Sequence, residues 1–503
     1  MCILRSRVLQ RHALALALLH DVGRMPYSHV YEYAIEDLVN VFDSDIAAEV
    51  EKYRRHDEAE ILMKLLHMVL DHSRALDCQL LAALSTLTYI PSSIMKERFR
   101  EFRDVLTRLA EPCSEACSDE DVEEYSVATV VRLLRDLINS NIDVDRADYM
   151  MRDIIAAGVR YGLFDIERLF SVMVLAPPPN IESAFRRPVL GILDKGVSVV
   201  ESMLISRSYM YSEVYLHRIV LAFNSMLARL IALLLYLALL AKRLGIDPDP
   251  PKLLNPEIAI RHRGSWISFT DSYVNTVVTQ CNRLLEQGPE REQSPLTTTF
   301  RNLLQRVDDR RRLVELCASA LFLSHLITRR RVPTVWICHE NERQAYKSAI
   351  DHYSEVVAIM RRSPILILST IPMLYSREFE GEPIYRTEHD VPVVMRGGDR
   401  WRIRYLRDVG YLITGLAETR FFRVIAVTPI IDPRSEVVSE LRSRNIQCKH
   451  CDEHHVESYT KTFIDALKVC ASLAGIDHEN TVRDIVSKIQ RDAVKLLETV
   501  FLR

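Results

Sequence analysis

The sequence has little net charge, no long hydrophobic run and no internal repeat. Its 65 basic and 68 acidic residues leave a net charge of -3, which offers no electrostatic basis for binding nucleic acid or an anionic membrane. The longest apolar stretch covers only residues 230–241, whereas a membrane-spanning helix needs about 20 residues. We therefore expect a buried helix there, no membrane association and no nucleic-acid partner.

Cysteine is sparse, with 10 residues scattered among 503, and no secretory leader precedes them. This usage predicts a reducing compartment and hence a cytoplasmic protein. One segment differs, because in CKHCDEHH the residues Cys448, Cys451, His454 and His455 approach a zinc-ligand set. Two histidines so close behind C-x2-C make an unusually tight loop, so we favour an incidental cluster over a zinc site.

The hydrophobic content of 48% allows a large core, and a chain of 503 residues predicts more than one domain. Helical periodicity runs through most of the chain to residue 330, so we expect a mainly α fold. A break at GIDPDPPKLLNP, and β-rich runs with Pro and Gly after Pro333, mark boundaries. The predicted parts are a helical core, a helical extension, a small α+β lobe and a C-terminal helical segment, at residues 1–245, 246–331, 332–436 and 437–503.

Within these parts, particular stretches of sequence predict individual strands and helices. VLGIL at 189–193 predicts a short strand, and the spacing after the next turn predicts helix to about residue 244. In the extension, helices are predicted around residues 266–285 and 307–327. In the lobe, strands are predicted at residues 334–338, 364–370, 391–396 and 421–431. Residues 456–503 return to a helical pattern.

His20 and Asp21 are adjacent at the end of an apolar helical run, in ALALALLHDVGRMPYSH. Gly23 and Pro26 follow and predict that the helix ends there, which leaves the pair at the mouth of a cleft. Imidazole nitrogen and carboxylate oxygen together suit a divalent ion that handles phosphate chemistry. A solitary pair of this kind arises by chance in most long chains, so its context decides its meaning.

A second polar segment, NIDVDRADYMMRD, stands far downstream. Asp143, Asp145 and Asp148 crowd a predicted helix start in this segment. A solvated helix N-terminus is one explanation, since acidic residues favour the first turn. However, Tyr149 and the two methionines after it make the segment half apolar, which favours partial burial.

Four segments, in order, resemble the HD superfamily of phosphohydrolases: LLHDVGRMPYSH, IDVDRADYMMRD, RYGLFDIERLF and DKGVSVVESMLISRSYMYSEVYLHR. The first is similar to the family's histidine–aspartate motif. The second resembles the later aspartate motif of the deoxynucleoside triphosphate (dNTP) triphosphohydrolase branch, which includes SAM-and-HD-domain-like proteins. The resemblance covers roughly residues 10–235, and it implies an HD-domain helical core followed by a helical extension.

Carried over by position, the resemblance makes His20, Asp21 and Asp145 three of four ligands of a divalent ion, whether Mn, Mg, Fe, Ni or Zn. The family's fourth ligand is an upstream histidine. His12 is the one candidate, but on a single helix it lies about 12 Å from His20, so we interpret it as structural or as a surface residue. Two explanations stay open: either Met1 is a truncated start, which we favour, or the first helix has been lost, which would make catalysis inefficient.

The resemblance also implies catalytic and substrate-binding residues. A histidine oriented by a carboxylate suits protonation of a leaving oxygen, and the matching pairs are His29 with Glu32, and His56 with Asp57. Cations, an aromatic face and a carboxylate suit a nucleoside triphosphate, and the matching residues are Arg24, Arg146, Tyr149, Asp153, Arg207 and Tyr215. Arg24 replaces a histidine that is common in the family. An arginine can contact phosphate but cannot shuttle protons. Surface ion pairs and core tyrosines are the alternative explanations.

The resemblance implies a metal-dependent enzyme that hydrolyses a dNTP at its α-phosphorus and releases deoxynucleoside and triphosphate. It also implies a homo-oligomer. One alternative is a phosphodiesterase or nucleotidase, because HD domains share ligands across substrates. Another is a catalytically impaired sensor that binds nucleotide without turnover, which would fit Arg24 and the missing histidine.

Overall fold

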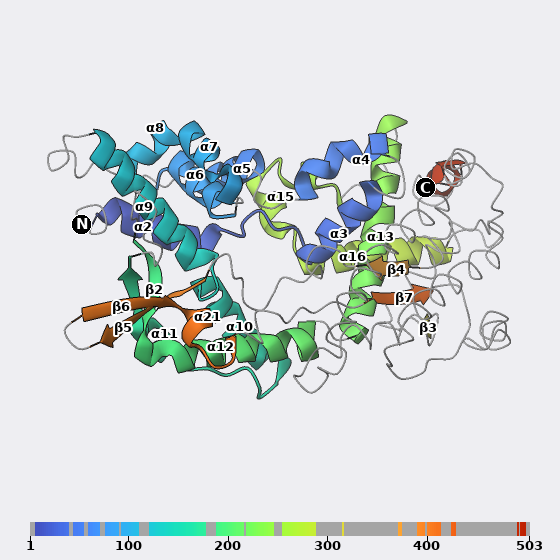
Figure 1. Ribbon diagram of the computed structural model, residues 1–503. Coiled ribbons are helices and arrows are strands. Elements are labelled where there is room, and N and C mark those ends of the chain that lie inside the picture. The colour runs from blue at the N-terminus through green and yellow to red at the C-terminus, as the bar shows by residue number, and fades with distance from the viewer. Residues whose placement is uncertain are drawn as a thin grey trace. The chain divides into compact units, whose positions relative to one another are not determined.

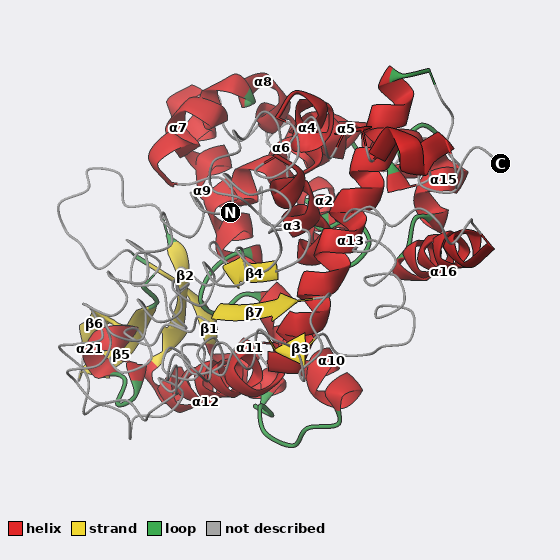
Figure 2. Ribbon diagram, turned by 90° about the vertical axis from the view of Figure 1, so that its right-hand side faces the viewer, coloured by secondary structure: helices red, strands yellow, loops and turns green. Residues whose placement is uncertain are grey.

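The structure is a computed structural model in which helices predominate (Figure 2), so the predicted mainly α fold is confirmed. It describes residues 6–39, 44–54, 59–70, 76–89, 92–109, 120–177, 188–215, 218–245, 254–287, 314–315, 371–374, 390–397, 400–413, 424–428, 490–491 and 493–498.

The chain divides into two compact units, and each is assembled from segments that are distant in sequence. Unit 1 comprises residues 1–24, 56–214 and 381–420. Unit 2 comprises residues 25–55, 215–380 and 421–503. The domain boundaries expected from the sequence remain predictions.

Unit 1 contains a helical bundle (Figure 1), and buried apolar side chains of its helices form one core. Its first helix, α2, runs from Arg7 to Leu19 and turns Leu9 and Leu16 inward, at helical spacing. Burying a leucine fully contributes about 1.5–3 kcal/mol, so the shared core holds α2 firmly in place. The helices that join it are α5 (Ala59–Leu70), α6 (Cys78–Tyr89), α7 (Ser92–Glu101), α8 (Arg103–Leu106) and α9 (Glu120–Ile138).

Unit 1 also contains a mixed four-stranded sheet in the order β1-β2-β5-β6. Strand β2 pairs antiparallel with β1, with Met173 opposite Ile192, and parallel with β5, with Ile192 opposite Val393. The backbones of β2 and β5 approach closely at Gly191, where an added Cβ would lie 2.7 Å from the Pro392 carbonyl oxygen. The strand bounds are Met173–Ala176, Val189–Leu193, Pro392–Gly397 and Arg400–Tyr405. Strands predicted at 189–193 and 391–396 are therefore confirmed.

The remaining helices of unit 1 include α10 (Val144–Ala157), α11 (Ile166–Val172), α12 (Val197–Met210) and α21 (Leu406–Val409). α10 begins at Asp143, whose side chain caps it, and ends at Gly158, whose φ of 67° closes it in a left-handed turn. After α12 the chain makes a wider, π-type turn over residues 211–215.

Unit 2 is organised around α13 (Arg218–Arg243), against which α3 (His29–Asp37) packs. Residues 230–241 of α13 are buried where their side chains are described, each at most 4% exposed, which confirms the predicted buried helix. Within the described residues no helix is both long and apolar enough to cross a membrane. Unit 2 also contains α4 (Ser44–Glu51), α14 (Pro256–Ala259), α15 (Arg263–Ser268) and α16 (Asp271–Gln287).

The small sheet of unit 2 corrects one prediction. Its order is β3-β7-β4, with β7 at Val424–Thr428 and β4 at Ile371–Leu374. β3 is Val314–Glu315, inside a stretch predicted to be helical, and it pairs antiparallel with β7. Backbone hydrogen bonds offered by β7 outweigh the local helical pattern there, because strand pairing depends on a distant partner. The strands predicted at 334–338 and 364–370, and the CKHCDEHH segment, lie outside the described residues.

Candidate metal centre

His20 is held at the end of α2 by its own helix. Its backbone N–H donates to the Leu16 carbonyl at 2.9 Å, and its ring Nδ1 lies 3.0 Å from the Ala17 carbonyl oxygen. A carbonyl can only accept, so this contact makes Nδ1 the protonated nitrogen of the neutral ring. Nε2 is thereby left as the nitrogen with a lone pair, directed away from the helix.

Asp145 is placed by the start of α10. Asp143, the capping residue, accepts hydrogen bonds from the backbone N–H groups of Arg146 at 2.7 Å and Ser140 at 2.8 Å. Asp145 therefore lies in the first turn, where the helix dipole favours a carboxylate.

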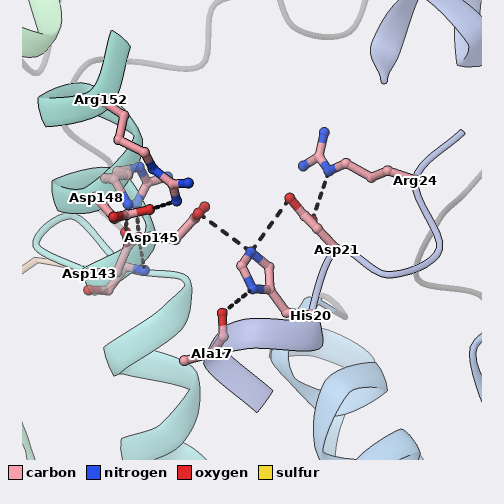
Figure 3. A network of polar contacts seen from close by, with 10 residues as sticks. Ala17, His20, Asp21, Arg24, Asp143, Asp145, Asp148 and Arg152 are labelled. Atoms are coloured by element: carbon pink, nitrogen blue, oxygen red, sulfur yellow. Dashed lines mark hydrogen bonds and ion pairs between the residues drawn. The ribbon is translucent and has the colours of Figure 1, made fainter. Parts of the chain in front are cut away.

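The two segments meet at His20 (Figure 3). His20 Nε2 lies 3.4 Å from Asp145 Oδ1 and 3.6 Å from Asp21 Oδ2. Burial acts to lower the pKa of His20, but the carboxylates of Asp145 and Asp21 favour the protonated ring, in which Nε2 can donate a hydrogen bond to Asp145, and they raise the pKa above its ordinary value. For Asp145, burial acts in the opposite direction to the neighbouring cations, and His20 with Arg24 and Arg146 lowers its pKa.

The nitrogen and carboxylate donors suit a divalent ion, and each carboxylate, taken singly, lies close enough to His20 Nε2 to share one with it. Two ligands that each lie about 2.1 Å from one ion can be at most about 4.2 Å apart, and both contacts of Nε2 are shorter than that. Within the described part of the chain, however, no three His, Cys, Asp or Glu side chains are grouped so as to hold an ion.

Arg24 forms an ion pair with Asp21, the second predicted ligand. Its Nε lies 2.7 Å from Asp21 Oδ1, across the turn that follows α2. The guanidinium therefore neutralises one oxygen of the carboxylate that an ion would use. The predicted phosphate contact of Arg24 stays a prediction.

Arg146 and Asp143 form a buried ion pair behind Asp145. Arg146 Nη1 lies 2.6 Å from Asp143 Oδ2, and the two side chains are 8% and 2% exposed. Burial raises the pKa of Asp143, and Arg146 offsets part of that rise. This pair was missed from the sequence, although the i,i+3 spacing at a helix start offered a signal. The predicted substrate contact of Arg146 stays a prediction.

Arg207 lies inside unit 1, on α12, with only 1% of its surface exposed. Its guanidinium lies 5.1 Å from the centre of the Tyr211 ring, one turn further on. Burial acts to lower the pKa of Arg207, but Tyr211 and Tyr149 raise it above its ordinary value. For Tyr149, a group that is charged when deprotonated, burial acts in the other direction and raises the pKa. Tyr211 was not predicted as a site residue, and its i+4 spacing from Arg207 was the available signal.

The other predicted site residues are distributed as follows. Asp153 is half-buried on α10 of unit 1. In unit 2, His29 Nδ1 lies 2.8 Å from Glu32 Oε2, so this predicted pair is formed, while its role stays a prediction. Tyr215 is half-buried in unit 2, at the end of the π-type turn. His56 and Asp57 lie outside the described residues.

His12 is structural, which is one of the two roles predicted for it, and it is not a surface residue. It is 3% exposed, with Nδ1 2.8 Å from the Val8 carbonyl oxygen, while Nε2 accepts the Asp77 N–H at 3.0 Å. Both ring nitrogens are thereby used within the bundle, so His12 offers no lone pair to an ion.

Comparison with known proteins adds a family match. Residues 180–243 match a family model described as "HD associated region". The uncharacterized protein MJ1154 of Methanocaldococcus jannaschii is 32% identical over 115 residues, or 22% of this chain and 24% of that protein. The uncharacterized protein YwfO of Bacillus subtilis is 28% identical over 204 residues, or 41% and 33% of the two chains. The matched part thus spans about a quarter to a third of these relatives.

Two solved structures resemble the chain weakly. A phosphohydrolase from Bacteroides thetaiotaomicron has 14% identity and a TM-score of 0.37, covering 80% of this chain and 94% of its own. A hypothetical protein from Aquifex aeolicus has 14% identity and a TM-score of 0.34, covering 85% and 93%. Likeness at this level decides nothing about activity. The family match supports an HD-type protein, with its associated region running from β2 through α12 to α13.

Proposed function

We propose that this chain is a metal-dependent HD-type phosphohydrolase whose substrate is a dNTP, which it cleaves to deoxynucleoside and inorganic triphosphate. The observation that carries the proposal is the meeting of His20 with Asp145, two residues far apart in sequence, while Asp21 lies beside the same ring nitrogen. A nitrogen between two carboxylates is a donor set for a divalent ion. The HD-associated region at 180–243 supports the same class.

His20, Asp21 and Asp145 would hold the ion, and the fixed ring of His20 would set its direction. A bound divalent ion neutralises phosphate charge and activates water. His29 would protonate the leaving oxygen, with Glu32 orienting its ring. These roles follow the family resemblance.

Arg24 links substrate binding to the metal ligands. A guanidinium binds phosphate oxygens in bidentate fashion, so a triphosphate would replace Asp21 as its partner. That exchange would free the Asp21 oxygen now 2.7 Å from Arg24 Nε. Substrate and ion would then favour each other's binding.

A second candidate is a sensor that binds nucleotide without hydrolysing it. The same Arg24–Asp21 contact favours it, because a ligand engaged by a permanent cation binds an ion less readily. Both candidates bind nucleotide, but only the phosphohydrolase hydrolyses it.

Product analysis tests the proposal. The protein is incubated with each dNTP and Mn²⁺, and phosphorus NMR identifies the product. We expect inorganic triphosphate, and a loss of more than about 100-fold in His20→Ala and Asp145→Asn, since losing groups that merely orient ligands already costs roughly 10–100-fold. His67→Ala, an exposed histidine on α5, serves as the matched control and should keep full activity.

The other outcomes separate the alternatives. Cleavage of a different phosphate ester without triphosphate would favour a phosphodiesterase or nucleotidase. Nucleotide binding without any turnover would favour the sensor. Activity that survives in His20→Ala would contradict the proposed centre.

A further inference from the structure

Tyr27 and Ser28 form a strained turn in unit 2. Among the described residues they are the non-glycine residues with positive φ, at 59° and 49°. Side chains with a Cβ rarely adopt this region, and two in succession are more unusual still. Ser28 is also the capping residue of α3, yet its side chain makes no capping hydrogen bond. Contacts with residues outside the turn must therefore stabilise this backbone conformation.

Helix α16 supplies that restraint. Asp271 Oδ1 accepts a hydrogen bond from the Tyr27 backbone N–H at 2.7 Å. Asn275 Oδ1 accepts one from the Tyr27 hydroxyl at 2.8 Å. The two acceptors are four residues apart and so lie on one face of α16. Helix α16 thus accepts hydrogen bonds from both the backbone and the side chain of Tyr27.

The Tyr27–Ser28 turn, held in this conformation, forms the start of α3. The Tyr27 carbonyl accepts from the Val30 N–H at 3.0 Å, and the Ser28 carbonyl accepts from the Tyr31 N–H at 3.0 Å. These bonds close the first turn of α3, which carries His29 and Glu32. The direction of the two carbonyls therefore decides where that pair points.

We propose that Asp271 and Asn275 are positioning residues, which clamp the Tyr27–Ser28 turn so that the first turn of α3 holds His29 and Glu32 in a fixed orientation. The inference rests on the proposed function in one respect, because it takes that pair as the acid–base pair. The clamp itself is argued from contacts within unit 2 alone.

The test compares four variants with the full-length protein. Asp271→Ala and Asn275→Ala remove one contact each, Asp271→Asn keeps an oxygen acceptor, and Ser272→Ala changes the exposed neighbour on the same helix. Amide hydrogen exchange is measured at Val30 and Tyr31, and kcat and KM are measured with a dNTP and Mn²⁺.

We expect the two contact-removing variants to speed exchange at these amides by about tenfold, the effect of losing one hydrogen bond. In the same variants kcat should fall several-fold while KM stays constant, since orientation is lost and binding is not. Asp271→Asn should recover most of both properties, and Ser272→Ala should match the wild type.

Unchanged exchange in both alanine variants would overturn the clamp. Faster exchange with an unchanged kcat in an active enzyme would overturn its positioning role. An inactive wild type would instead refute the proposed function, and hydrogen exchange alone would then decide whether α16 holds the turn.

Discussion

His20 illustrates how a backbone sets the direction of a side chain. The contact of Nδ1 with the Ala17 carbonyl fixes the ring within its own helix, so Nε2 needs no further residue to aim it. The carboxylates opposite Nε2 come from the next residue and from a helix start more than a hundred residues away. Such a meeting requires the bundle to be folded, so we expect the centre to be lost in any partly unfolded form.

Gly410 provides a prediction at the same scale. An added Cβ would lie 2.5 Å from Ile413 Cγ1 and 3.0 Å from the Leu406 carbonyl oxygen. Ile413 is fully buried and cannot move aside easily. Gly410→Ala should therefore destabilise the protein by about 1–3 kcal/mol, measured as a lower midpoint of thermal unfolding.

A matched control is available on α15. Gly264 has no heavy atom within 4 Å of the position of an added Cβ, and its φ is not in the positive region. Gly264→Ala should leave the midpoint unchanged or raise it, because alanine favours a helix. Equal effects of the two substitutions would contradict the steric argument.

The sequence pointed to three candidate ligands, whose role stays a prediction, and it missed the arginines that form ion pairs beside them. His20, Asp21 and Asp145 were identified because their motifs are local and recognisable. The Arg24–Asp21 and Arg146–Asp143 pairs were missed because an ion pair depends on side-chain rotamers and on burial, which a motif does not record.

The junction between α2 and α6 shows how one element orients another. Asp77 caps α6, accepting from the N–H groups of Gln79 at 2.9 Å and Leu80 at 3.1 Å. Its own N–H is bound by His12 of α2, and its second carboxylate oxygen lies 2.6 Å from Arg108 Nη1. Three segments of the bundle are thus joined at one residue, and α2 is the helix that carries His20 at its end.

Asp77 provides a pH-dependent prediction. Burial acts to raise its pKa, but Arg108 and the backbone N–H donors lower it below the ordinary value. A depressed folded pKa contributes stability above the unfolded value of about 3.9, and that contribution disappears as the pH falls through the folded pKa. Asp77→Asn, which can still cap α6, should cost up to about 1 kcal/mol at pH 7, because the ion pair is partly exposed.

Urea unfolding at several pH values measures this difference. The gap between wild type and Asp77→Asn should persist to about pH 4 and close only at more acidic pH. A gap that closes above pH 5, or that grows as the pH falls, would contradict the assignment.

At the scale of elements, single helices and strands were easier to predict than the pairing of strands. The buried part of α13 followed from an unbroken apolar run, which any helix of that composition must bury. Val314–Glu315 became β3 against expectation, because a strand is stabilised by its partner and β7 lies far along the chain. The pairing of β2 with β5 likewise joins two distant regions of sequence, and no local pattern predicts it.

For the whole molecule, the sequence suggested consecutive domains, while the compact units are interleaved along the chain. The segment around β5, β6 and α21 belongs to unit 1, where Glu201 of α12 accepts a hydrogen bond from the Leu412 N–H at 2.7 Å. Helix α12 also carries Arg207. Leu412, in the predicted α+β lobe, therefore contacts α12, the helix that carries the predicted substrate residue Arg207. An arrangement of consecutive domains does not predict this contact.

We propose that His20, Asp21 and Asp145 together hold one divalent ion. The most direct measurement is the Mn²⁺ content of the full-length protein after equilibration and removal of free ion, compared with His20→Ala and with His67→Ala as control. We expect stoichiometric ion in the wild type and in the control, and its loss in His20→Ala. A wild type that retains no ion, or a His20→Ala variant that retains as much as the wild type, would contradict the claim.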